Sequence, residues 1–204
     1  MSVTVAKTAG FCFGVRRAVD LAEQQTRQGG EIYAYGEIIH NMHEIARLEK
    51  MGVHTAQTLD GIPDGERVLI RAHGVARSVY DAFRQKNCEI YDATCPFVQK
   101  IHRIVDRESR DGRLVLILGK EGHPEVEGIR GWCSESVVID GERAAQTFAD
   151  ALEPASRPVS LVAQTTVNRA IWNISVSILK KRCTNLKIFD TICKATDERQ
   201  SEAR

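Results

Sequence analysis

The chain has 204 residues, which is enough to bury one or two hydrophobic cores. Its 28 Lys and Arg residues nearly balance its 27 Asp and Glu residues, so no overall basic field favours nucleic acid, and any anionic ligand must be held by local groups. The sequence has no apolar signal-peptide core and no run long enough to span a membrane, so we expect a cytoplasmic protein. In that reducing compartment the six cysteines indicate metal binding, catalysis or packing rather than disulfides.

Apolar runs of strand length recur along the chain, and each is followed by a segment with helical spacing of its apolar residues. The expected strands cover residues 3–8, 31–36, 67–72, 89–94, 113–119, 137–140, 158–165 and 187–191. The expected helices begin near residue 15 and then cover residues 41–52, 78–87, 96–112, 124–132, 142–152 and 168–182. This alternation is typical of parallel sheets covered by helices, and we predict an α/β fold.

Three similar segments place a cysteine where a strand gives way to a helix: GFCFG with Cys12, DATCPF with Cys95 and DTICKA with Cys193. Their separations are the size of a domain, so the sequence indicates up to three related α/β units. By the same topology, we expect Cys88 and Cys183 to lie near the other edge of the sheets, away from these three cysteines.

The carboxyl ends of parallel strands form one edge where ligands bind, so residues just after strands share a functional rim. This rule gathers Cys12, Cys95 and Cys193 with several other reactive side chains. These are His40, His73, His123, Glu125, Thr165 and Thr166. Because helix N-termini favour anions, thiolates are less costly there than elsewhere in the fold.

Structural interpretations of the same residues remain open at this point. Glu125 could simply complement the dipole of a helix opened by Pro124, and His73 could be a strand-ending histidine bonded to backbone. Residues 164–166 could form the N-cap of the following helix. Cys133, at the end of a short helix, is most simply a packed thiol. No C-x-x-C pair is present, so local spacing supports neither a zinc ribbon nor a ferredoxin motif.

Taken in order, seven segments resemble the LytB/IspH family, the hydroxymethylbutenyl diphosphate reductases of the non-mevalonate isoprenoid pathway. They are GFCFGVRRAV, EIIHN, RAHGV, DATCPFVQKIH, GHPEVEG, AQTT and DTICKATDERQ. The resemblance implies repeated parallel-sheet α/β lobes around a central iron-sulfur site, with the third lobe mostly missing because the chain stops at Arg204. It implies a strand and first cysteine in residues 1–13, one lobe in 14–96, another in 97–192 and the start of the third in 193–204.

The resemblance also implies one 4Fe-4S cluster per chain, held by Cys12, Cys95 and Cys193 with one iron left open. Glu125 would deliver protons, Thr165 would hold the substrate hydroxyl, and the histidines would bind the diphosphate. Those histidines are His40, His73 and His123. The implied partners are a small-molecule diphosphate and a reduced ferredoxin or flavodoxin-type donor, with neither nucleic acid nor membrane.

Two other functions compete with this reductase. A catalytically impaired remnant would keep the fold as a binding module, and its expected lack of the C-terminal lobe would open the site to solvent. A zinc hydrolase would use the same three cysteines with an open fourth position, and its preparation would be colourless rather than brown.

Overall fold

The computed structural model describes residues 5–151 and 157–202, which form two compact units. One unit consists of residues 11–99, and the other of the N-terminal residues up to Gly10 together with residues 100–204. Each unit is built around its own four-stranded sheet, and all strand pairs in both sheets are parallel. The predicted α/β fold is therefore confirmed. Within the described ranges, no helix is both long enough and apolar enough to cross a membrane.

The sheet of residues 11–99 has the strand order β2-β1-β3-β4. Its strands are β1 (Ile32–Tyr35), β2 (Val53–Ala56), β3 (Arg67–Ile70) and β4 (Glu89–Asp92). Its helices are α1 (Phe13–Arg27), α2 (Met42–Lys50) and α3 (Arg77–Gln85). Since β1 pairs with both β2 and β3, the chain changes direction across the sheet between β1 and β3. Ligands bind at such a switch point in open α/β sheets.

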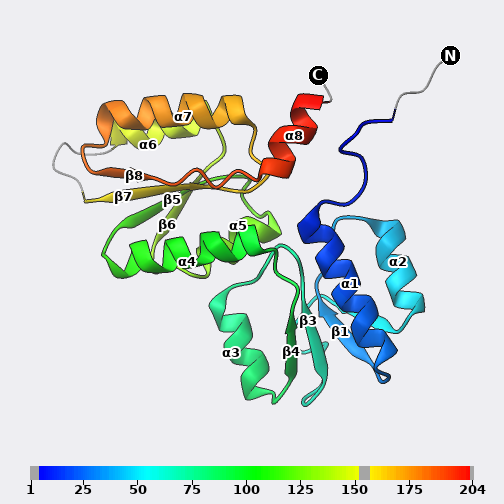
Figure 1. The fold of residues 1–204 in the computed structure, drawn as a ribbon. Helices are drawn as coiled ribbons and strands as arrows, with labels where there is room; N and C mark the ends of the chain where they lie inside the picture. The colour runs from blue at the N-terminus through cyan, green and yellow to red at the C-terminus, as the bar shows by residue number, and fades with distance from the viewer. Residues whose placement is uncertain (1–4, 152–156, 203–204) are drawn as a thin grey trace. The chain divides into compact units, whose positions relative to one another are not determined.

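Helices cover both faces of this first sheet (Figure 1). On one face, Ala18, Val19 and Ala22 of α1 and Leu48 of α2 are buried against β1. The α1 residues follow the three- and four-residue spacing that places side chains on one side of a helix. On the other face, α3 buries Phe83 in a second cluster.

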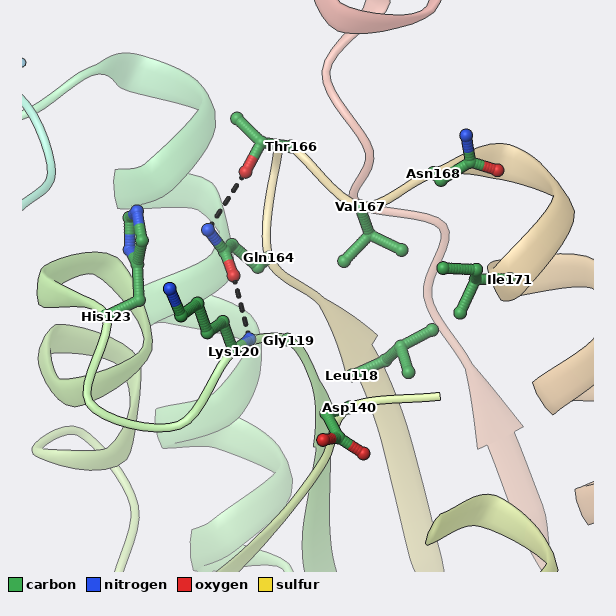
Figure 2. Close-up of a pocket in the computed structure, with 10 residues that line it drawn as sticks. All are labelled: Leu118, Gly119, Lys120, His123, Asp140, Gln164, Thr166, Val167, Asn168 and Ile171. Carbon is green, nitrogen blue, oxygen red and sulfur yellow. Dashed lines mark hydrogen bonds between the residues drawn. The ribbon is translucent and has the colours of Figure 1, made fainter. Parts of the chain in front are cut away.

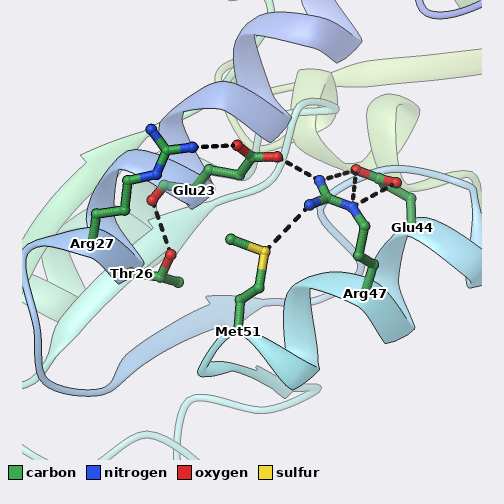
Figure 3. Close-up of polar contacts among 6 residues, drawn as sticks. All are labelled: Glu23, Thr26, Arg27, Glu44, Arg47 and Met51. Atoms are coloured by element: carbon green, nitrogen blue, oxygen red, sulfur yellow. Dashed lines mark hydrogen bonds and ion pairs between the residues drawn. The ribbon is translucent and has the colours of Figure 1, made fainter.

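Charged side chains join α1 to α2 on the outer surface of this layer. The Arg47 guanidinium contacts Glu23 of α1 at 2.6 Å and Glu44 of its own helix (Figure 3). Exposed pairs of this kind contribute about 0–1 kcal/mol each, so the apolar contacts beneath them hold the layer together.

The second sheet repeats the order of the first, as β6-β5-β7-β8. Its strands are β5 (Leu114–Leu118), β6 (Ser136–Ile139), β7 (Val159–Ala163) and β8 (Leu186–Ile188). The helices are α4 (Pro96–Arg110), α5 (Pro124–Arg130), α6 (Glu142–Ala151), α7 (Arg169–Arg182) and α8 (Lys194–Glu202). Helices α6 and α7 cover one face, while α4 and α5 cover the other. Every residue of β5 and β7 is buried, as expected for central strands covered on both faces.

Two strand assignments differ from the sequence prediction. The strand expected over residues 3–8 is wrong for its described part, since residues 5–8 form no strand, and residues 3 and 4 lie outside the described residues. The backbone N–H groups of Lys7 and Thr8 donate to the Glu202 carboxylate of α8 instead of to a neighbouring strand. Strand β2 was not predicted, because its four residues follow α2 after only Met51 and Gly52 and contain no apolar run.

Candidate functional site

Glu125 and Thr165 meet at the carboxyl ends of β5 and β7. The backbone N–H of Thr165 donates to Glu125 Oε1 at 2.6 Å, and the Thr165 hydroxyl donates to Oε2 at 2.8 Å. The Glu125 side chain is buried, with an exposed fraction of 2%. Burial raises the pKa of Glu125 to about 7, while the two bonds from Thr165 act in the opposite direction. A carboxyl group with this pKa can hold and release a proton near neutral pH.

The loop before α5 fixes the direction of Glu125. His123 is the N-cap of α5, and its Nδ1 accepts a hydrogen bond from the backbone N–H of Glu125 at 3.1 Å. Pro124 occupies the first helical position, where its missing N–H costs nothing. In the neutral imidazole, an accepting Nδ1 places the ring proton on Nε2, which can then donate to an anionic ligand.

A cavity of about 430 Å³ lies beside this loop at the switch point between β5 and β7 (Figure 2). Its lining residues come from the end of β5, from the loops after β5, β6 and β7, and from the start of α7. They are Leu118, Gly119, Lys120, His123, Asp140, Gln164, Thr166, Val167, Asn168 and Ile171.

The Gln164 amide holds two of the loops around this cavity. Its Oε1 accepts from the backbone N–H of Lys120, and its Nε2 donates to the Thr166 hydroxyl (Figure 2). A side chain at Gly119 would place its Cβ 2.8 Å from Val126 and 3.0 Å from Gln164, so any larger residue there would force these side chains to shift. The N-cap of α7 is Asn168, which excludes the alternative that residues 164–166 cap this helix.

His40 and His73 form a pair in residues 11–99. Their ring centroids are 4.1 Å apart, with the ring planes inclined by 34°. The backbone N–H of Ala72 donates to the carbonyl of Ile38 at 3.0 Å, which ties the loop after β1 to the loop after β3. His40 Nδ1 also lies 3.5 Å from the Glu37 carboxylate. Two imidazoles at this end of the first sheet can donate to the same anion.

The three cysteines singled out by the sequence each stand directly before a helix. The carbonyl of each cysteine accepts a hydrogen bond from the backbone N–H four residues later. These bonds begin α1 after Cys12, α4 after Cys95 and α8 after Cys193. The positive end of each helix dipole therefore lies beside a cysteine. The position of Cys12 differs from the prediction in one respect, because no strand precedes it in the described residues.

Cys95 and Cys193 have close partners within their own units. A side chain at Gly14 of α1 would place its Cβ 2.5 Å from Cys95 Sγ, so the glycine leaves room for this thiol two residues from Cys12. The Cys193 N–H donates to the carbonyl of Thr165 at 2.9 Å, which joins the Cys193 loop to the residue that binds Glu125.

Within the described residues, no three His, Cys, Asp or Glu side chains converge closely enough to hold a metal ion. Cys12 and Cys95 belong to residues 11–99, whereas Cys193 belongs to the other unit, so neither unit contains all three thiols.

The remaining cysteines are part of the packing. Burial raises the pKa values of the Cys133 and Cys183 thiols, and Cys133 Sγ donates to the carbonyls of Ile129 and Arg130. Cys183 ends α7 and is 8% exposed. The interpretation of Cys133 as a packed thiol is confirmed, since it packs against a buried apolar cluster.

Comparison with known proteins decides the family. The sequence profile of the LytB protein family matches residues 3–204, which is nearly the whole chain. The chain belongs to the LytB family. This result confirms the resemblance inferred from the seven sequence segments.

Curated members of the LytB family match along the whole length of this chain. The 4-hydroxy-3-methylbut-2-enyl diphosphate reductase of Clostridioides difficile is 38% identical over 205 residues, covering 100% of this chain and 73% of the relative. The enzyme of the same name from Geobacter sulfurreducens is 40% identical over 207 residues and is covered to 71%. The chain thus spans somewhat more than two thirds of these relatives.

Two solved structures of reductases have the same fold. The E-1-hydroxy-2-methyl-but-2-enyl-4-diphosphate reductase from Plasmodium falciparum matches with a TM-score of 0.88 and 28% identity, covering 94% of this chain and 61% of that protein. An (E)-4-hydroxy-3-methyl-but-2-enyl diphosphate reductase, described as the terminal enzyme of the non-mevalonate pathway, matches with a TM-score of 0.83 and 35% identity. That alignment covers 98% of this chain and 71% of the other.

Three residues around the cavity were missed by the sequence analysis as contributors to a site. Lys120 and Asp140 follow β5 and β6, and Gln164 follows β7. The rule that selects residues after strands applies equally to these three, but it cannot tell which polar side chains turn toward a cavity. Gln164 was considered only as a helix cap.

Proposed function

We propose that this chain is a 4-hydroxy-3-methylbut-2-enyl diphosphate reductase of the non-mevalonate pathway. In the proposed reaction, the allylic alcohol takes up two electrons and two protons, its C–O bond breaks, and one water is released with isopentenyl or dimethylallyl diphosphate. Membership of the LytB family supports the substrate. The observation that carries the chemistry is the buried Glu125 carboxyl, which accepts two hydrogen bonds from Thr165 and has a pKa raised to about 7 by burial.

The proposed cofactor is one 4Fe-4S cluster per chain with Cys12, Cys95 and Cys193 as its protein ligands. The residues fit this group chemically, because thiolates are the usual protein ligands of iron-sulfur clusters and each cysteine lies at a helix N-terminus. The absence of a side chain at Gly14 further leaves space around the sulfur of Cys95. When bound through three thiolates, such a cluster supplies electrons and one open iron that acts as a Lewis acid.

Glu125 is the proposed proton donor. Hydroxide is a poor leaving group, so a proton must reach the departing oxygen, and a second proton must reach the carbon skeleton. The raised pKa keeps a large share of Glu125 protonated near pH 7. Thr165 orients the carboxyl through its N–H and is proposed to hold the substrate hydroxyl through its own hydroxyl. Protonation at either end of the allyl system would give the two products.

The diphosphate is proposed to bind to His40, His73 and His123. The tilted pair of His40 and His73 offers two ring donors together, and His123 offers Nε2 when Nδ1 accepts from Glu125. Hydrogen bonds to a charged diphosphate are stronger than those between neutral groups. The same residues compensate the negative charge that substrate brings.

A reduced ferredoxin or flavodoxin-type protein is the proposed electron donor, and the proposed location is the cytoplasm. The test is an anaerobic assay with a chemically reduced viologen and the allylic alcohol diphosphate, with the products separated by mass spectrometry. The proposal predicts both diphosphate products and one water per two electrons. Reversible substrate binding without any product would instead support a binding module.

A further inference from the structure

The loops that present Cys95 and Cys193 share a local structure. In each, an aspartate stands three residues before the cysteine, in the sequences DATC and DTIC. Asp92 Oδ1 accepts from the backbone N–H of Thr94 at 2.8 Å, and Asp190 Oδ1 accepts from the N–H of Ile192 at 3.3 Å. Each carboxylate thus accepts a hydrogen bond from the backbone N–H of the residue two positions later in the chain. This bond defines an Asx turn.

Both loops also continue the register of their sheets. The Cys95 N–H donates to the carbonyl of Ala72, two residues beyond the end of β3. The Cys193 N–H donates to the carbonyl of Thr165, two residues beyond the end of β7. Both bonds are 2.9 Å long. Each cysteine is therefore held between a strand-like bond at its N–H and a helix that begins at its carbonyl.

The second carboxylate oxygen is engaged in both loops as well. Asp92 Oδ2 accepts from the Tyr80 hydroxyl at 3.1 Å and from Gln99 Nε2 at 3.2 Å. Asp190 Oδ2 pairs with the Arg169 guanidinium, which also pairs with Asp197 of α8. Each aspartate therefore ties its cysteine loop to a neighbouring helix as well as to its own turn.

We propose that Asp92 and Asp190 are equivalent positioning residues, whose Asx turns fix the loops that present the thiols of Cys95 and Cys193. The role of these thiols as cluster ligands rests on the proposed function, whereas the claim that the aspartates hold the two loops in place does not. A loop already held in one conformation loses less entropy when its thiol binds. With both oxygens engaged, neither carboxylate is available as a competing metal ligand.

The two aspartates differ in the expected size of their effect. Asp92 has the shorter turn bond and three carboxylate bonds, whereas the Asp190 side chain is 52% exposed and its turn bond is longer. Since exposed charged pairs contribute little, the loss of Asp92 has the larger effect.

The test measures the alkylation rates of individual cysteines in the 204-residue chain, prepared free of iron under anaerobic conditions, with the rates read by peptide mass spectrometry. Asp92→Ala is expected to raise the rate at Cys95 by about two- to tenfold, which corresponds to the net contribution of the turn bond from the N–H of Thr94, and to leave Cys193 unchanged. Asp190→Ala is expected to raise the rate at Cys193 by a smaller factor and to leave Cys95 unchanged.

Asparagine variants separate positioning from charge. Asn keeps the Oδ1 acceptor of the Asx turn but replaces the acceptor Oδ2 with an NH2 donor, so Asp92→Asn and Asp190→Asn are expected to alkylate more slowly than the matching Ala variants. If the carboxylates acted through charge, the Asn and Ala variants would behave alike, and the proposal would be overturned. Asp60→Ala and Asp111→Ala replace exposed aspartates in the two units and serve as matched controls.

Cys183 reports whether a variant of the second unit is still folded, because its thiol is buried and unfolding of that unit exposes it to the reagent. An increase at Cys183 equal to that at Cys193 would mean general unfolding and would contradict the proposal for Asp190. A second readout is the iron retained after anaerobic reconstitution. If the alkylation pattern holds but the unsubstituted chain takes up no iron, the positioning role stands and the proposed function fails.

Discussion

Thr165 donates two hydrogen bonds to Glu125, one from its backbone N–H and one from its hydroxyl, while its carbonyl accepts from the N–H of Cys193. One residue thus connects a buried carboxyl to a proposed cluster ligand. The arrangement has consequences that can be measured for proton transfer, for stability and for ligand binding.

Glu125→Gln is expected to lower the turnover rate by about a hundred- to ten-thousand-fold, because Gln keeps the shape of the side chain but has no acidic proton to give. The rate is measured with a chemically reduced viologen under anaerobic conditions. The matched control is Glu127→Gln, which replaces an exposed side chain two residues further along α5. Its turnover rate should stay within about threefold of that of the unsubstituted protein. A Glu125→Gln variant with the same rate as this control would remove Glu125 from the mechanism.

Thr165→Val is expected to move the basic limb of the pH–rate profile to higher pH. Both bonds from Thr165 lower the pKa of Glu125, so losing the hydroxyl bond raises this pKa further above about 7. Thr165→Ser retains the hydroxyl and should restore the original limb. An unchanged limb in the valine variant would show that the profile reports on a different group.

Glu125 should also make the stability of its unit depend on pH. The folded protein holds this proton up to pH about 7, whereas the unfolded chain releases it near the ordinary value of 4.5, so the folded state binds more protons between these values. The free energy of unfolding therefore falls as the pH rises through this range, by up to about 3 kcal/mol. Glu125→Gln should remove this part of the decline.

Urea unfolding followed by tryptophan fluorescence measures this effect directly, because Trp132 and Trp172 both lie in the unit that contains Glu125. The stability difference between Glu125→Gln and the unsubstituted protein should grow in favour of Gln from pH 5 to pH 8. Parallel stability curves for the two proteins would contradict the raised pKa.

Much of this fold could be predicted from sequence because each strand and helix has a local pattern. The fully apolar run of β5 and the Pro96 that opens α4 indicate their elements without tertiary information. The strand prediction failed where hydrogen bonding to a segment far away in the sequence decides the structure. Residues 5–8 belong to a run of strand length, but the N–H groups of Lys7 and Thr8 bond Glu202. The short β2 becomes a strand only because β1 lies beside it.

The candidate site was predictable in part for the same reason. Strand topology placed Glu125 and Thr165 on one rim, but only the folded chain shows that they bond each other. The repeated aspartates could have been found from sequence, since DATC and DTIC align without gaps. Their role depends on side-chain bonds to Tyr80 and Arg169 that no local pattern encodes.

Removing the ring of His73 should weaken the binding of inorganic pyrophosphate. His73→Ala deletes one ring of the tilted His40–His73 pair, and a lost hydrogen bond to a charged ligand reduces affinity roughly tenfold or more. Isothermal titration calorimetry of the 204-residue chain gives this affinity. His54→Ala removes an exposed histidine of β2 and is the matched control, with no expected change. Equal affinity in both variants would exclude His73 from the diphosphate site.

The most direct test of the proposed cluster is iron, sulfide and zinc analysis of the anaerobically reconstituted chain beside its Cys193→Ser and Cys88→Ser variants. The account predicts about four iron and four sulfide per chain for the unsubstituted protein and for Cys88→Ser, and a clear loss of both for Cys193→Ser. One zinc per chain without sulfide, or equal iron in all three proteins, would contradict it.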